Sequence, residues 1–247
     1  MTNLVIRALA AGEEHLFESL SDPGLVSFAA AGKTFTEMRY RPEWSWIALR
    51  DGIVVARAAW WGAPEDTEPI ALDWYDFTDT DAAIALLRTA PFHTQYVIRV
   101  PPDFEQRPEV KAEATRRIDA ATAAGMLPLV DRYRYRWTTE CGVPDRPGRL
   151  IFRPEPDDKV IFDVLREIAH GTLDAHAVRD IERGGYDAAA RDDMDNLLWL
   201  PGPRDWWRLG YTESGELAGF VAPSRNFTDP VIAFVGVVPA QRGHGYA

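Results

Sequence analysis

The sequence is poor in several features that would point to particular classes of protein. It has a single cysteine, Cys141, so no internal disulfide can form, and a reducing, cytoplasmic environment is the simple expectation. Its apolar runs are short and broken by charge, and none approaches the roughly 20 residues that span a bilayer. Basic residues are outnumbered, with 27 Lys and Arg against 38 Asp and Glu. The resulting formal charge of -11 argues against general binding to nucleic acid or to anionic membranes.

What is present suits a globular protein. The chain has 247 residues, of which 46% are hydrophobic and nine are Trp, enough for one large domain or two small ones with packed cores. The first seven residues, Met1-Thr-Asn-Leu-Val-Ile-Arg7, lack the basic start and long apolar middle of a signal peptide. They are typical of a strand.

The last seventeen residues combine a strand with a glycine-spaced basic turn. An apolar, β-branched run, Val231 to Val238, stops at Pro239 and leads into Gln241-Arg-Gly-His-Gly-Tyr-Ala247. Gly243 and Gly245 permit positive φ angles and leave the backbone amides accessible, as an anion-binding concavity requires. No Lys follows the glycines, which excludes a nucleoside triphosphate-binding loop of the Gly-x-x-x-x-Gly-Lys type.

This turn, with Val237-Val-Pro239 before it, resembles the acyl-CoA motif of the GNAT superfamily of N-acetyltransferases, Gln/Arg-x-x-Gly-x-Gly/Ala. Arg242, Gly245 and Ala247 stand at its three defining positions. The resemblance implies that acetyl-CoA is the co-substrate, with its diphosphate on main-chain amides of the turn and its pantetheine arm along the end of the strand. The cofactor-binding residues so implied are Val237, Val238, Arg242, Gly243, His244, Gly245, Tyr246 and Ala247.

The chain also repeats itself in outline. Leu4-Val-Ile-Arg7 and Leu150-Ile-Phe-Arg153 are each followed by an acidic turn and an amphipathic helix, then by a hairpin and a third strand. The two hairpins have Asp51-Gly52 and Ser214-Gly215 at their turns. The order strand, helix, hairpin, strand is the first half of the acetyltransferase fold. We therefore expect an α/β (α+β) protein with tandem GNAT-like acyl-CoA N-acyltransferase folds, each a mixed central sheet flanked by helices.

The first copy is expected to span 1–140 and the second 149–247, with a linker rich in Pro and Gly between them. The second copy stops on the last position of its motif, so it is expected to be incomplete. The first copy shows its remaining elements: helices over 79–88 and 108–125, and strands over 95–100 and 127–137. Its counterpart of the glycine turn is Phe77-Thr-Asp-Thr-Asp81-Ala, whose carboxylates would repel a diphosphate. The first copy is thus predicted not to bind coenzyme A in the usual way.

The connecting segment of the second copy contains His170, Asp174 and His176. Their spacing matches no zinc pattern, so no metal site is expected. Two interpretations stay open: a pocket for the acceptor, or a solvated helix-loop-helix in which Thr172 or Asp174 caps a helix. The acidic run Asp192-Asp-Met-Asp195 has a solvent-facing helix as its default interpretation. The alternating Arg132, Arg134 and Arg136 are best explained as one face of a strand.

The resemblance implies acetyl transfer from acetyl-CoA to a primary amine by direct attack, with a small-molecule acceptor and a monomeric or homodimeric enzyme. Neither the catalytic acid nor the base is assigned; Asp174, His176 and Asp229 are candidates for these roles. The alternative is a non-catalytic tandem pseudo-acetyltransferase that binds a ligand or partner. Transfer of a different acyl group, such as succinyl or propionyl, also stays open.

Overall fold

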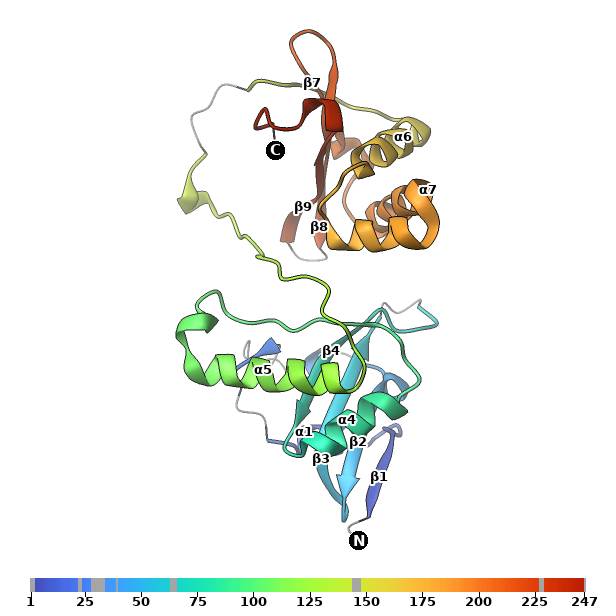
Figure 1. The fold of residues 1–247 in the computed structure, drawn as a ribbon, viewed down its shortest axis with the longest axis vertical. Helices are drawn as coiled ribbons and strands as arrows, with labels where there is room; N and C mark the ends of the chain where they lie inside the picture. Colours follow the sequence, from blue (N-terminus) through green and yellow to red (C-terminus); the bar gives the residue numbers. More distant parts are fainter. Residues whose placement is uncertain are drawn as a thin grey trace. The chain divides into compact units, whose positions relative to one another are not determined.

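The structure is a computed structural model that describes residues 3–21, 24–27, 34–38, 40–62, 66–143, 148–226 and 229–246. The chain forms two compact units, Met1–Pro128 (unit 1) and Leu129–Ala247 (unit 2), each built around its own sheet (Figure 1). In the described part of the chain, no helix has both the length and the apolar character needed to cross a membrane.

Unit 1 contains a five-stranded mixed sheet. The strands follow in chain order, and all neighbours are antiparallel except the last pair, which is parallel. At the hairpin between the second and third strands, Asp51 and Gly52 both have positive φ, 51° and 85°, as a two-residue primed turn requires. The strands are β1 (Leu4–Ala8), β2 (Ser45–Arg50), β3 (Ile53–Trp61), β4 (Ala71–Phe77) and β5 (Gln95–Tyr96).

Helices cover both faces of this sheet. On one face, α4 (Thr80–Thr89) and α5 (Pro108–Ala123) pack small side chains such as Ala82 and Ala83 against β2, β3 and β4. On the other face, α1 (Glu14–Glu18) and α3 (Phe35–Met38) contribute Phe17 and Phe35 to a second cluster. Since β4 lies between helical layers, all seven of its residues are buried. The α/β class with a mixed sheet flanked by helices is therefore confirmed.

A buried ion-pair network ties β4 to its neighbours. The Asp76 carboxylate accepts hydrogen bonds from Arg57 on β3 (3.0 Å), Arg117 on α5 (2.6 Å) and the Trp74 indole (2.5 Å). Arg57 and Arg117 are 4% and 1% exposed, and hydrogen bonds to Asp76 replace part of the solvation that each charge has lost; Arg117 also pairs with Glu113. The network fixes the side of β4 that faces α5.

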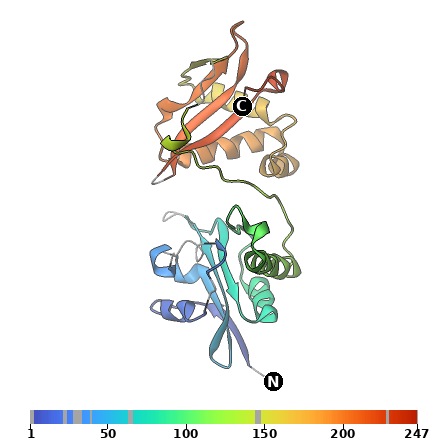
Figure 2. The ribbon, with the colours of Figure 1, turned by 90° about the vertical axis from the view of Figure 1, so that its left-hand side faces the viewer.

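Unit 2 contains a four-stranded sheet in the order β6-β7-β8-β9, antiparallel throughout its described residues. Helices α6 and α7 pack on one face, as Figure 2 shows, and bury Ile161, Leu165 and Leu197 against strand residues Leu209 and Phe220. Non-helical backbone at Gly185 breaks α7. The bounds are β6 (Ile151–Arg153), α6 (Asp158–Ala169), α7 (Ala175–Trp199), β7 (Arg208–Tyr211), β8 (Leu217–Asn226) and β9 (Asp229–Val237).

The predicted order strand, helix, hairpin, strand is present in both units. Two strand predictions for the first copy were not confirmed over their full length. The one over 95–100 is reduced to Gln95–Tyr96, and the one over 127–137 is wrong, because the backbone there belongs to no described strand and its residues are exposed. Tyr133 and Tyr135 are 81% and 90% exposed. Period-two alternation gives a strand only where a neighbouring strand edge supplies hydrogen bonds, and none is described beside this segment.

Candidate anion-binding loop

The glycine-spaced turn lies directly after β9, the edge strand of the unit 2 sheet. Pro239 begins a short 3-10 turn, Pro239–Gln241, that ends the strand. Gly243 and Gly245 follow with φ of 82° and 69°, a region that costs other residues backbone strain. The loop 243–246 is thus held in a conformation that its glycines permit. Ala247, also predicted to bind the cofactor, lies outside the described residues.

The backbone amides of this loop are available. Gln241 and Arg242 donate their N–H groups to Val238 and Pro239, which closes the 3-10 turn. Over the described residues, no group accepts a hydrogen bond from the next four amides, those of 243–246. Gly243, His244 and Gly245 are exposed, so these donors are open to solvent. Four consecutive unpaired amides form a concentration of hydrogen-bond donors.

An arginine that the sequence did not single out orients part of this loop. Arg149 donates from one guanidinium nitrogen to the His244 carbonyl (2.8 Å) and from the other to the Gly245 carbonyl. The peptide bonds of the described residues are trans, and in a trans peptide the C=O and N–H of one plane point in opposite directions. The N–H groups of Gly245 and Tyr246 therefore point away from Arg149. A Cβ on Gly245 would lie 3.3 Å from the Arg149 guanidinium.

Arg242 contacts protein carbonyls. Its guanidinium donates to Ile168 (2.6 Å), His170 (2.7 Å) and Gly171 (2.9 Å) at the end of α6, and its Nε donates to Val237 (3.1 Å). The side chain predicted to approach a phosphate thus joins the loop to the turn between α6 and α7. The exposed main-chain amides of 243–245 are not involved in these contacts.

The aromatic residues at the end of the loop lie against each other. The rings of His244 and Tyr246 are nearly parallel, with centroids 5.8 Å apart, and the Arg149 guanidinium lies 5.1 Å from the Tyr246 ring. His244 Nδ1 is 3.2 Å from the Gln241 carbonyl. These contacts limit the freedom of the exposed side chains without covering the amides.

An apolar groove of about 130 Å³ crosses the sheet face that α6 and α7 leave bare. Its lining includes Gly210 and Gly219 of the sheet and Tyr246 of the loop. The groove therefore adjoins the loop, so a ligand with a charged group on the amides has an apolar surface beside it. Its other lining residues are Leu150, Phe152, Ala218, Phe220, Val221, Val235, Gly236 and Val237.

The two valines predicted to contact the pantetheine arm each use one backbone group in a hydrogen bond within the protein. The Val238 N–H donates to Ala218 (3.0 Å), and the Val237 carbonyl accepts from Arg242 (3.1 Å). The Val238 side chain is buried in the core, while Val237 lines the groove. Of these two residues, only Val237 presents its side chain to a ligand in the groove.

The corresponding loop of unit 1 is already occupied by a carboxylate. Asp79 precedes α4, and its side chain accepts from the Ala82 amide (3.0 Å) and from Arg50 (2.7 Å). These hydrogen bonds hold the pKa of Asp79 below its usual value. A negative side chain at a helix N-terminus takes the position that an anionic ligand would use.

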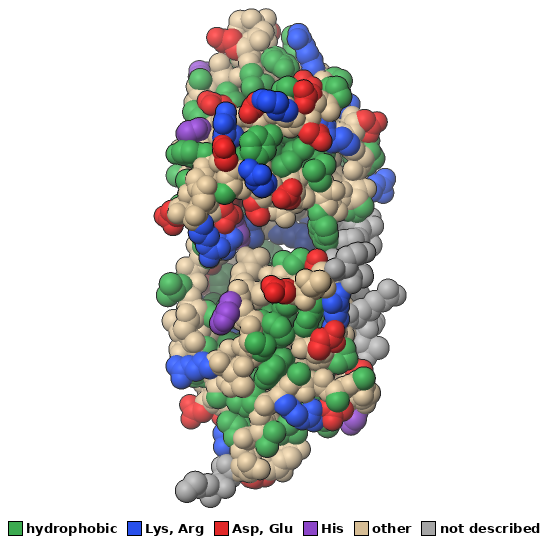
Figure 3. Space-filling model, turned by 90° about the vertical axis from the view of Figure 1, so that its right-hand side faces the viewer, with side chains coloured by type: hydrophobic (Ala, Val, Ile, Leu, Met, Phe, Trp, Pro, Cys, Tyr) green, Lys and Arg blue, Asp and Glu red, His purple; other side chains and the backbone are tan. Residues whose placement is uncertain are grey.

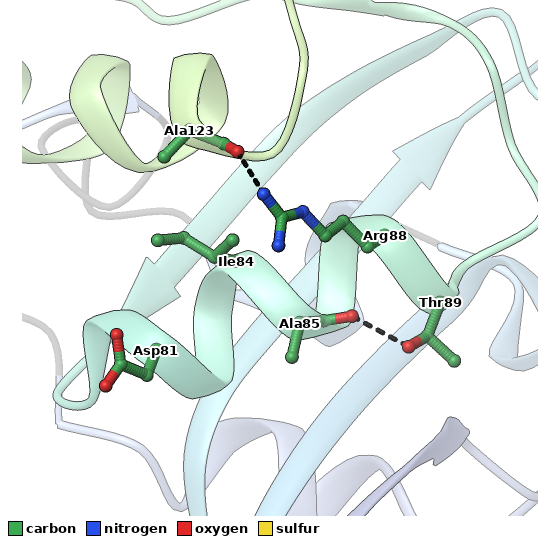
Figure 4. A pocket seen from close by; sticks show the side chains of 6 residues that line it. All are labelled: Asp81, Ile84, Ala85, Arg88, Thr89 and Ala123. Carbon is green, nitrogen blue, oxygen red and sulfur yellow. Dashed lines mark hydrogen bonds between the residues drawn. The ribbon is translucent and has the colours of Figure 1, made fainter.

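A shallow hollow of about 450 Å³ lies between α4 and α5 (Figure 4). Its cation, Arg88, donates to the Ala123 carbonyl at 2.7 Å, and Thr89 donates to Ala85 at 2.7 Å within α4. Asp81 and Ile84 complete much of its lining. Arg88 and Thr89, two of the residues drawn in Figure 4, thus each donate a hydrogen bond to a backbone carbonyl.

The residues considered for the acceptor pocket have local structural partners. Asp174 caps α7 by accepting from the His176 and Ala177 amides (2.9 and 3.0 Å). His170 stacks on Tyr186, with centroids 3.8 Å apart. Burial lowers the pKa of His176, and nearby Arg132 lowers it further. In the described residues, no group of three or more His, Cys, Asp or Glu is arranged to hold a metal ion.

The remaining acidic candidates do not converge on the loop. Asp229, at the start of β9, is 3.9 Å from Arg136 and well exposed. In the acidic run of α7, burial raises the pKa of Asp193 to about 6, and Asp192 adds to the effect. Figure 3 shows acidic and basic side chains intermixed with hydrophobic ones on the face it displays. On that face, the net negative charge is not gathered into one patch.

No protein-family model and no curated protein matches the chain. Among solved structures, it is similar to a GCN5-related N-acetyltransferase from Sphaerobacter thermophilus (13% identity, TM-score 0.46, 98% of this chain and 78% of that one). It is also similar to a tandem GNAT protein from the clavulanic acid biosynthesis pathway, solved without AcCoA (16% identity, TM-score 0.41, 98% and 82%). The fold class itself rests on the two sheets described above.

Proposed function

We propose that unit 2 binds the diphosphate of acetyl-CoA on the amides of 243–246 and that the protein transfers the acetyl group to a primary amine. The observation that carries the proposal is the run of four exposed-loop N–H groups, those of 243–246, that have no acceptor among the described residues and follow an edge strand after one 3-10 turn. The fit is one of donor chemistry, because an anion that accepts several hydrogen bonds suits donors fixed by the backbone.

Acetyl-CoA supplies the activated acyl group as a thioester. The chain's own contribution is to hold the diphosphate, to offer the groove beside Val237 and Tyr246 to the apolar part of the ligand, and to orient the thioester along β9. As an edge strand, β9 has backbone groups on its outer side for pairing with an extended chain. One such N–H could bind the carbonyl oxygen as negative charge develops on it.

No described residue is assigned as the catalytic acid or base. Asp174 serves as a helix cap, His176 is partly buried, and Asp229 is exposed near Arg136. The acceptor class proposed is a small primary amine. Coenzyme A thioesters of other acyl groups, succinyl and propionyl among them, have the same diphosphate and are also compatible with the loop.

A second function is favoured by one observation in unit 1. Because Asp79 occupies the helix N-terminus there, that unit is unsuited to a diphosphate, and the whole chain could act as a binding module without catalysis. The two functions differ in product formation. The enzyme releases free coenzyme A when an acceptor amine is present, whereas a binding module does not.

The first test is thermal unfolding of the full chain with and without acetyl-CoA. A ligand present at about 100 times its dissociation constant adds about 2.7 kcal/mol to the free energy of unfolding, so the transition of unit 2 should move upward. A panel of primary amines then screens for release of free thiol. An absent thermal shift rejects acetyl-CoA binding; a shift without thiol release across the panel favours the binding module.

A further inference from the structure

The contacts of Arg242 extend beyond its own loop. Four of its five N–H groups bond to main-chain carbonyls, and three of these carbonyls belong to Ile168, His170 and Gly171. The last carbonyls of a helix have no partner within it, and a cation is favourable at that end. Local backbone N–H groups of His170 and Thr172 bond to Glu167 and Ala169, and Arg242 adds hydrogen bonds to Ile168, His170 and Gly171 that these leave unmade.

Gly171 makes this contact possible. Its φ of 64° turns the chain out of α6, and a Cβ at this position would lie 3.2 Å from a guanidinium nitrogen of Arg242. Both the backbone angle and the close approach favour glycine. The turn at 170–174 and the loop at 243–246, about 70 residues apart in sequence, are thus held together by one side chain.

We infer that Arg242 is a positioning residue, which sets the orientation of the diphosphate loop by fixing it to the α6–α7 turn, and that its charge is not used on the ligand. The inference rests on the proposed function for its binding consequence. It has a structural consequence as well. The turn carries His170 and leads to Asp174, residues considered for the acceptor pocket, so the Arg242 side chain joins the loop to that segment.

The sharpest test compares Arg242→Lys with Arg242→Met. A lysine keeps the charge, but its single ammonium cannot reach carbonyls on both sides of the planar guanidinium. Affinity for acetyl-CoA, measured by isothermal titration calorimetry, should fall by about tenfold in both variants and to a similar extent. If Arg242→Lys binds like the wild type while Arg242→Met is weakened, the charge contacts the phosphates and the inference is overturned. Free methylguanidinium should restore part of the affinity of Arg242→Ala, but not that of Arg242→Lys, whose side chain fills the space.

A second pair of variants approaches the same contact from the other side. Gly171→Ala and Gly185→Ala both place a side chain at positive φ, but only the former meets Arg242; nothing lies within 4 Å of a Cβ at Gly185. We expect Gly171→Ala to weaken acetyl-CoA binding by about tenfold and Gly185→Ala to leave it unchanged within about twofold. Equal effects would show that backbone strain alone is responsible and would count against the inference.

Hydrogen exchange of the unliganded protein separates this inference from the proposed function. In Arg242→Lys, the amides of 168–174 should exchange faster than in the wild type, while those of β2 and β3 in unit 1 should not change. Unchanged exchange at 168–174 overturns the inference even if acetyl-CoA binds. If the wild type fails to bind acetyl-CoA and exchange at 168–174 nevertheless increases, the proposed function fails and the structural link stands.

Discussion

At the scale of single residues, glycines and arginines make the loop together. The two loop glycines supply backbone angles that other residues adopt at a cost of about 1 kcal/mol or more. Arg149 binds the His244 and Gly245 carbonyls, so the amides of Gly245 and Tyr246 face away from it, and Arg242 joins the start of the loop to the end of α6. In a chain with formal charge -11, the cations closest to the site help a ligand indirectly, through the orientation of backbone dipoles.

Gly245→Ala should therefore reduce acetyl-CoA binding. The new methyl group would be held at φ near 69° and 3.3 Å from the Arg149 guanidinium, so the loop or the arginine must shift. We expect a loss of affinity of about tenfold or more, read by titration calorimetry. The control is Gly215→Ala, at φ of 86° in the β7–β8 hairpin with open space around it. Comparable loss in both variants would contradict a specific role for the loop.

Asp73 gives unit 1 a pH-dependent stability. Burial raises the pKa of Asp73 to about 6. The hydrogen bond from the Tyr40 hydroxyl (2.6 Å) and the positive charge of Arg99 both lower this pKa and offset part of the rise. The folded pKa lies above the unfolded value of 3.8, so the folded state binds the proton more tightly. The favourable contribution of the protonated carboxyl is complete below about pH 4 and disappears as the pH rises past about 6.

Asp73→Asn should consequently raise the free energy of unfolding at pH 7.5 by about 1–3 kcal/mol and change it little at pH 4. Asn keeps an acceptor for the Tyr40 hydroxyl. Urea unfolding at the two pH values checks this. The control is Asp76→Asn on the same strand, which breaks the buried pairs with Arg57 and Arg117 and should destabilise the protein by about 3–5 kcal/mol. Stabilisation that is independent of pH would contradict the account.

At the scale of secondary-structure elements, the loop after β4 in unit 1 and the loop after β9 in unit 2 differ in which group accepts hydrogen bonds from their backbone amides. In unit 1, the Asp79 side chain caps α4. In unit 2, the loop has no such internal acceptor among its described neighbours. The same position in the repeated order thus has a built-in anion in one unit and free donors in the other.

Removing the internal anion should cost stability without creating a binding site. Asp79→Ala loses the cap and the pair with Arg50, and we expect unit 1 to lose about 1–2 kcal/mol in urea unfolding. The matched control, Asp81→Ala, changes a first-turn acid that does not cap the helix, and should cost a few tenths of a kcal/mol. Acetyl-CoA affinity should remain as in the wild type. Gain of a second acetyl-CoA site would show that the carboxylate alone separates the two loops.

The sequence predicted the elements whose signals are local. Asp51-Gly52 predicted a hairpin and both residues adopt positive φ, and the acidic start at Asp79 predicted the helix that it caps. The strand over 127–137 failed because a strand depends on a partner edge as well as on alternation. Arg149 was missed as a site residue and Arg242 was given a different role. Their partners lie 95 and more than 70 residues away, and no local pattern encodes which carbonyls a long side chain reaches.

At the scale of the whole molecule, the two units have a similar order of elements but differ in which faces of their sheets the helices cover. Unit 1 covers both faces of its sheet with helices, whereas the described residues of unit 2 cover one face and leave the groove beside the loop open. An exposed edge strand, an apolar groove and unpaired amides therefore coincide in unit 2. The chain's capacity for a diphosphate ligand is concentrated there.

The most direct test of the central claim is titration of the full chain with acetyl-CoA, with hydrogen exchange used to locate the bound ligand. The account predicts one binding site per chain, with slower exchange at the amides of 243–246 and no change at 78–82. Absence of binding, or protection at 78–82 with none at 243–246, would contradict it.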